Sequence, residues 1–124
     1  MTKILYVEDN EDNVYMLSRR LKRKGFEIVV AVDGEQGVEM ASLEKPDLIL
    51  MDLSLPKMDG WTATKHIKSN DDLKSIPIIA LSAHAMEEHK QRAIDSGCND
   101  YDTKPVDIER LLSKISAQLG AKND

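Results

Sequence analysis

The chain is poor in the features that build disulfide scaffolds, nucleic-acid interfaces and membrane spans. Its single cysteine, Cys98, excludes an internal disulfide and suits a cytoplasmic protein. Aromatic residues make up only 4% of the 124 residues, so the core must be aliphatic. The 17 basic side chains are outnumbered by 22 acidic ones, and the net charge of −5 disfavours nucleic acid and anionic membranes as partners. No apolar run approaches the length of a membrane span.

What the sequence does contain is a series of short, continuous apolar runs. Continuous rather than alternating apolar residues indicate strands that are covered on both faces by helices. A weaker fifth candidate, residues 101–103, is assigned mainly from its position. The four clear runs are residues 4–7, 28–31, 48–51 and 78–81.

Helical patterns fill the segments between these runs. The first has apolar residues at three- and four-residue steps and ends at Gly25. Asp33, with Gln36 three residues later, predicts the start of the second helix. Asp107 caps the last helix, which has the clearest apolar stripe. The third and fourth helices are expected at about residues 61–68 and 86–96.

The repeated order of strand then helix predicts an α/β fold. Five such repeats with short connections give a parallel sheet, right-handed crossovers and helices on both faces, a (βα)5 three-layer sandwich. The sequence has no linker and no low-complexity tract. We therefore expect a single domain over residues 1–124, with no output domain.

Polar residues follow four of the expected strands. Glu8 and Asp9 come after the first, Asp52 after the third, Ser82 after the fourth and Lys104 after the fifth. The carboxyl ends of parallel strands meet at one edge of the sheet, where ligands bind in such folds. Taken singly, these residues have ordinary interpretations, such as a turn at Glu8 and Asp9, a helix cap at Ser82 or a solvated lysine. The joint arrangement favours a functional site.

The chemistry of this set is specific. Three converging carboxylates repel one another, so a cation must offset them or their pKa values must rise. Oxygen ligands of this kind suit Mg²⁺, with Mn²⁺ as a substitute. One carboxylate can then act as a nucleophile towards phosphorus, and aspartate is an established phosphoryl acceptor. Lys104 could stabilise the added negative charge on Asp52, and Ser82 could donate a hydrogen bond to it.

Four segments spread over essentially the whole chain form a specific combination: ILYVEDN at 4–10, PDLILMDLSLPKMDG at 46–60, IIALSA at 78–83 and GCNDYDTKP at 97–105. With these segments the sequence resembles a response-regulator receiver domain. The resemblance implies a flavodoxin-like sheet with strand order 2-1-3-4-5.

The resemblance also assigns roles in the site. Asp52 would be the phosphoacceptor, Glu8 and Asp9 the acidic pair that holds Mg²⁺ together with Asp52, and the backbone carbonyl of Ser54 a further metal ligand. Asp9 would bind the metal directly, whereas Glu8, longer than the usual aspartate, would reach it through water.

The remaining roles concern readout and lifetime. Lys104 would bind the phosphoryl group and form a cis peptide bond with the following proline. Ser82, in place of the commoner threonine, would be the switch hydroxyl. Tyr101 would be the aromatic residue that turns inward after phosphorylation. Ser54 and His84 would tune the phosphoryl lifetime, so that changing His84 alters the dephosphorylation rate.

The implied function is that of a single-domain response regulator in a two-component system or phosphorelay. A phosphohistidine of a sensor histidine kinase or a histidine phosphotransfer protein would donate the phosphoryl group. The domain would catalyse only its own phosphorylation and dephosphorylation, so it is not a turnover enzyme. A downstream protein would bind the face made by the fourth helix, fifth strand and fifth helix. The chain resembles single-domain division-control regulators of the DivK type and relay intermediates.

Several alternatives remain open from sequence alone. The chain could be a receiver cut from a hybrid sensor kinase, or an interaction module that does not depend on phosphorylation. A phosphatase of the haloacid-dehalogenase type needs a second aspartate two residues after its nucleophile, where this chain has Ser54. A flavodoxin needs a Ser/Thr/Gly-rich phosphate loop after the first strand, where this chain has EDNED, residues 8–12.

Overall fold

The computed structural model describes residues 1–83 and 87–123, and only the backbone of residues 121–123. Strands and helices alternate along these residues in the predicted order, with boundaries that differ from the predicted ones by a few residues. The elements are β1 (Lys3–Val7), α1 (Glu11–Arg23), β2 (Glu27–Ala31), α2 (Gly34–Glu44), β3 (Leu48–Asp52), α3 (Gly60–Lys68), β4 (Ile78–Ser82), α4 (Glu87–Asp95), β5 (Asp100–Thr103) and α5 (Ile108–Asn123).

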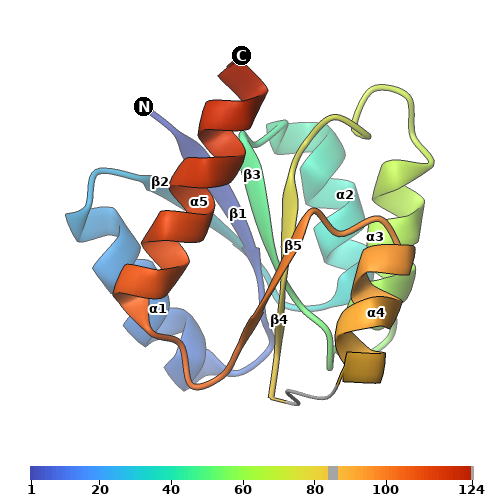
Figure 1. Ribbon diagram of the computed structural model, residues 1–124, viewed down its shortest axis with the longest axis horizontal. Helices are drawn as coiled ribbons and strands as arrows, with labels where there is room; N and C mark the ends of the chain where they lie inside the picture. The colour runs from blue at the N-terminus through green and yellow to red at the C-terminus, as the bar shows by residue number, and fades with distance from the viewer. Residues whose placement is uncertain (84–86, 124) are drawn as a thin grey trace.

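The five strands form one parallel sheet in the order β2-β1-β3-β4-β5. Helices α1 and α5 cover one face, and α2, α3 and α4 cover the other (Figure 1). All five strands run in the same direction, so their carboxyl ends lie along one edge, at the bottom of Figure 1. The predicted three-layer fold and strand order are confirmed.

Two apolar layers hold the sheet between the helices. The central strands β3 and β4 are buried along their whole length, which explains their continuous apolar sequences. Along β1, Leu5 faces α2 and α3, whereas Ile4 and Tyr6 face α1 and α5. Strand β2 lies at the edge of the sheet and is only partly buried. No helix within residues 1–83 and 87–123 is long and apolar enough to cross a membrane.

Side-chain caps begin the helices close to this carboxyl edge. The side chain of Asp33 accepts from the backbone N–H of Gln36 at 2.8 Å, as the sequence predicts. Gln36 reaches back to the N–H of Val32 at 2.7 Å, rather than to that of the cap residue itself. Similar caps at α1, α3 and α5 use Asn10, Asp59 and Asp107.

Two glycines allow the loops at this edge to approach one another closely. A Cβ on Gly60 would lie 2.2 Å from the backbone oxygen of Asp52, and a Cβ on Gly34 would lie 1.9 Å from that of Met58. Neither distance is possible for a real side chain. The loop after β3 is therefore fixed against the start of both α2 and α3.

Candidate functional site

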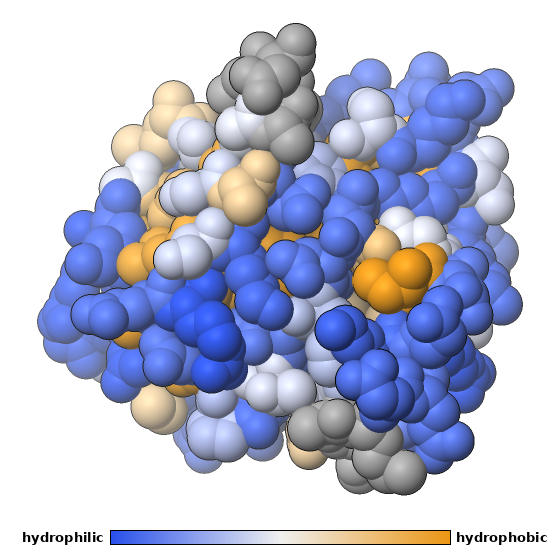
Figure 2. Space-filling view, in the orientation of Figure 1, coloured by the Kyte–Doolittle hydropathy of each residue, from blue (hydrophilic) through white to orange (hydrophobic). Residues whose placement is uncertain are grey.

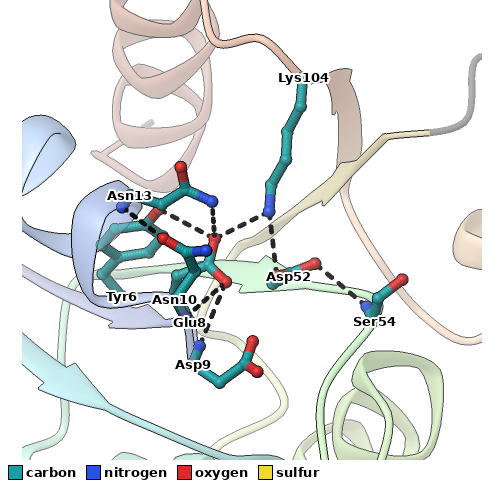
Figure 3. A network of polar contacts seen from close by, with 8 residues as sticks. All are labelled: Tyr6, Glu8, Asp9, Asn10, Asn13, Asp52, Ser54 and Lys104. Carbon is teal, nitrogen blue, oxygen red and sulfur yellow. Dashed lines mark hydrogen bonds and ion pairs between the residues drawn. The ribbon is translucent and has the colours of Figure 1, made fainter.

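The carboxyl ends of β1 and β3 bring three carboxylates together, as the sequence predicts. Glu8 and Asp9 follow β1, and Asp52 is the last residue of β3. One carboxylate oxygen from each lies within 4.8 Å of the others, an arrangement that could hold a metal ion. Glu8 and Asp52 are buried, whereas Asp9 is exposed (all three are drawn in Figure 3). The set suits a hard divalent cation such as Mg²⁺.

Lys104 lies between two of these carboxylates. It follows β5, and its side chain extends to the carboxyl ends of β1 and β3 (Figure 3). The Nζ atom lies 2.8 Å from Oε1 of Glu8 and 3.0 Å from Oδ2 of Asp52. The lysine therefore offsets part of the negative charge without any bound ion. Its peptide bond to Pro105 is cis, as predicted.

Glu8 is held by a hydrogen-bond network that the sequence reading missed. Its Oε2 atom accepts from the backbone N–H groups of Asp9 at 3.1 Å and Asn10 at 3.3 Å. Its Oε1 atom accepts from Tyr6 Oη at 3.4 Å and Asn13 Nδ2 at 3.2 Å, in addition to the lysine (Figure 3). Tyr6 lies in the first apolar run, which predicts that its ring is buried but not that its hydroxyl bonds to Glu8. The position of Asn13, one helical turn after the acidic pair, was the only available signal.

Burial and neighbouring charges together shift the pKa values of three groups in this network. Burial, together with the neighbouring Asp52, raises the pKa of Glu8, although Lys104 works against this. Burial lowers the pKa of Lys104, but its hydrogen bonds to Glu8 and Asp52 outweigh that effect and leave it raised. Burial, with the charges of both carboxylates, raises the pKa of Tyr6, which stays a protonated donor. Without a cation, Glu8 thus holds its proton more tightly than a free carboxylate does.

The loop after β3 fixes the carboxylate of Asp52. The backbone N–H of Ser54 donates to Oδ1 of Asp52 at 3.1 Å, while Lys104 occupies the other oxygen. The Asp52 residue is 4% exposed. Its carboxylate is therefore held in one orientation at the bottom of the acidic cluster.

Ser82 and Tyr101 lie on the neighbouring strands. Ser82 ends β4 and is buried, and its backbone oxygen accepts from the N–H of Lys104 at 2.8 Å. Tyr101 on β5 packs among the residues under α3 and α4 and is 6% exposed. The residue is thus buried in this structure, and its inward movement after phosphorylation stays a prediction. His84 lies outside the described residues.

The remaining chemically active side chains do not join this site. Cys98 is buried, donates to or accepts from Thr64, and has its pKa raised by burial to about 11. A buried thiol with a raised pKa is a poor nucleophile. His66 is exposed, and the His89 ring lies 5.7 Å from that of Trp61 on the surface of α3 and α4.

A doubly wound parallel sheet whose strand ends carry three carboxylates and a lysine defines a class of small α/β switch domains. The chain belongs to the response regulator receiver domain family, whose model matches residues 4–116. It is 36% identical over 117 residues to the polar-differentiation response regulator DivK of Brucella anthropi, a match that covers 94% of this chain and 95% of the relative.

Solved structures show the same fold. A two-component response regulator from Clostridium difficile superimposes with a TM-score of 0.92, at 31% identity and with 100% of both chains covered. The receiver domain of a sensor histidine kinase from Pseudomonas aeruginosa gives a TM-score of 0.90 at 34% identity, covering 96% of this chain and 98% of that one. The latter was solved with a magnesium ion coordinated in its active site cleft.

Family membership gives the chain a role in phosphorylation-dependent two-component signalling. Members of this family are signalling proteins rather than enzymes in the usual sense, and they act through kinases and downstream targets. This chain has an acidic cluster that could hold a metal ion, and a homologous receiver domain was solved with Mg²⁺ in its active site cleft.

Proposed function

We propose that this chain is a single-domain response regulator that accepts a phosphoryl group on Asp52 from a phosphohistidine donor, in a reaction that requires Mg²⁺. One observation carries the proposal. Among the three clustered carboxylates, Asp52 is the one whose two oxygens are oriented by Ser54 and Lys104 at the end of a buried strand. A nucleophile needs such a fixed orientation towards phosphorus.

The metal would be held by Asp9, Asp52 and the backbone carbonyl of Ser54, with Glu8 acting through water. Mg²⁺ supplies positive charge at the phosphoryl oxygens, and Mn²⁺ can substitute for it. The network around Glu8 supports this division of roles, because that carboxylate already accepts five hydrogen bonds from the protein. Asp9 is exposed and can meet an incoming ion.

Lys104 would turn from its two carboxylates to the phosphoryl group, and Ser82 would donate to the same group. Both residues are connected to β5, because the Lys104 N–H donates to the Ser82 carbonyl and Ser82 pairs with Thr103. Tyr101 on that strand would then repack, with Ser54 and His84 setting the phosphoryl lifetime.

The donor would be a sensor histidine kinase or a histidine phosphotransfer protein. The downstream protein would bind the face formed by α4, β5 and α5. This face is largely hydrophilic, with an apolar patch over α4 (Figure 2). Ile94 of α4 is 41% exposed, so the contact would combine polar groups with one apolar anchor.

The test is intact-mass analysis after incubation with acetyl phosphate and Mg²⁺. The wild-type chain should gain the mass of one phosphoryl group, whereas Asp52→Asn should gain none. Asp71→Asn is the matched control, because this aspartate is exposed and far from the site, and it should be modified like the wild type. An unmodified wild-type chain, or equal adducts on wild type and Asp52→Asn, would contradict the proposal.

A further inference from the structure

A groove runs between α1 and the edge strand β2, on the opposite side of α1 from α5. Its volume is about 470 Å³, which falls within the range of small-molecule sites. The walls are mainly apolar and are formed by Val14 and Tyr15 of α1 and by Val30 and Val32 at β2. Tyr15 and Val32 are 64% and 50% exposed, so two large apolar side chains border this groove on the surface.

A buried hydroxyl without a partner lines the same groove. Ser18 of α1 is 8% exposed, and among the described residues its Oγ atom has no hydrogen-bond partner. A serine inside a helix can usually bond to the carbonyl four residues earlier, so this hydroxyl is unusual. A buried polar group without a partner is costly and calls for an explanation. A ligand atom in the groove would provide the missing bond.

The groove has opposite charges at its two ends. Glu8, Asp9 and Glu11 border one end, and Arg19 and Lys22 border the other. At the acidic end, Glu8 is already occupied by Lys104.

At the basic end, the guanidinium of Arg19 donates to Tyr15 Oη at 3.0 Å and lies 5.7 Å from the Tyr15 ring centroid. The Arg19 side chain is thus held at the groove by one of its walls. Its remaining N–H groups can form charge-assisted bonds to an anion.

We propose that this groove binds a small amphipathic anion. The apolar body would lie between the valines and the Tyr15 ring, its anionic group would contact Arg19 and Lys22, and Ser18 would donate to a polar atom of the ligand. The acidic end of the groove adjoins the carboxylate cluster at Glu8 and Asp9, but the proposed ligand contacts lie along α1 and β2 and do not depend on the function proposed above.

The test uses two fluorescent probes that share one apolar body. One is 8-anilinonaphthalene-1-sulfonate, and the other is N-phenyl-1-naphthylamine, which lacks the sulfonate. The folded protein should bind the sulfonate probe saturably, at one site, and more tightly than the neutral probe. The double variant Arg19→Gln/Lys22→Gln should weaken sulfonate binding by about tenfold or more, because charge-assisted bonds are lost. Its affinity for the neutral probe should stay within about twofold.

Matched variants separate a built site from general attraction to a basic helix. Arg20→Gln/Arg23→Gln removes the same charge from exposed positions of α1 outside the groove, and should leave sulfonate binding within about twofold. Val32→Trp fills the groove from an exposed position and should abolish binding of both probes. Absence of saturable binding, equal loss in both double variants, or unchanged binding in Val32→Trp would overturn the proposal. Circular dichroism verifies that each variant is folded.

Discussion

Glu8 has the most heavily bonded carboxylate of the described site. Two backbone N–H groups bond to one of its oxygens, and Tyr6, Asn13 and Lys104 bond to the other. An aspartate at this position would be one methylene shorter and could not keep all of these contacts. The longer residue therefore serves to organise the cluster, while Asp9 and Asp52 remain for the metal.

Lys104 should stabilise the ion-free protein. Lys104→Gln leaves Glu8 and Asp52 close together without a counter-charge, so the free energy of unfolding should fall by roughly 2 kcal/mol. This is less than for a fully buried pair, because the lysine side chain is 21% exposed. Urea unfolding without Mg²⁺ measures the loss, and Mg²⁺ should restore part of it. Lys65→Gln, at an exposed position of α3, is the control and should change stability little; an equal loss there would refute the idea.

The raised pKa of Glu8 predicts how the effect of Mg²⁺ depends on pH. In the folded ion-free protein this carboxyl binds its proton more tightly than in the unfolded chain. The stability that protonation of Glu8 contributes is therefore complete below the ordinary glutamate pKa of about 4.3. It is lost as the pH rises through the raised pKa of the folded state. The stabilisation by Mg²⁺ should accordingly grow over this interval, because the ion must otherwise compete with the proton.

Urea unfolding at several pH values, with and without Mg²⁺, measures this growth. In Glu8→Gln, which has no titratable carboxyl at this position, the growth over this interval should be weaker than in the wild type. A stabilisation by Mg²⁺ that does not vary with pH in the wild type would count against the mechanism.

At the scale of secondary structure, most of the strands were predictable because buried strands have continuous apolar sequences. β3 and β4 are buried along their whole length and were located to within one residue. The helix caps at Asp33 and Asp107 were equally visible, since each cap depends on one local side chain. β5 was assigned only from its position, because its sequence DYDT has no apolar run.

Individual hydrogen bonds between side chains of different elements could not be predicted from the sequence. Asp102 of β5 is buried, and its Oδ1 accepts from Arg110 Nε of α5 at 2.8 Å. The Tyr6 hydroxyl contact with Glu8 was missed for a similar reason, since an apolar run says nothing about where one hydroxyl points. Strand-end residues were predictable as a group because parallel topology alone brings them together.

Gly60 should be essential to the position of Asp52. In Gly60→Ala the new Cβ would meet the backbone of Asp52 and Leu53, so the loop after β3 must move. We expect a loss of about 1–3 kcal/mol in unfolding free energy, together with slower phosphorylation by acetyl phosphate, because the acceptor is displaced. Denaturant unfolding and mass spectrometry measure the two effects.

Gly120→Ala is the control for this prediction. Nothing lies within 4 Å of a Cβ at that position of α5, so alanine should stabilise the helix slightly and leave phosphorylation unchanged. A Gly60→Ala variant that unfolds and reacts like the wild type would contradict the assigned role.

For the whole molecule, phosphorylation should affect one half of the sheet more than the other. Ser82 and Lys104 connect the site to β5, whereas β2 lies beyond β1 on the opposite side. Hydrogen exchange with excess acetyl phosphate and Mg²⁺ should therefore change in β5 and α5, with little change in β2 and α2. The Asp52→Asn variant should show neither effect. Equal changes in β2 and β5 would contradict a directional switch.

The five hydrogen bonds to Glu8 also bear on how the protein would use magnesium in the cell. With that carboxylate occupied, the proposed direct ligands are two aspartates and one carbonyl, and water must complete the octahedral shell of the ion. An ion that is held mostly by water dissociates readily. The fraction of the protein with bound Mg²⁺ would therefore follow the concentration of free Mg²⁺. The strength of the response would then depend on magnesium supply as well as on the activity of the donor kinase.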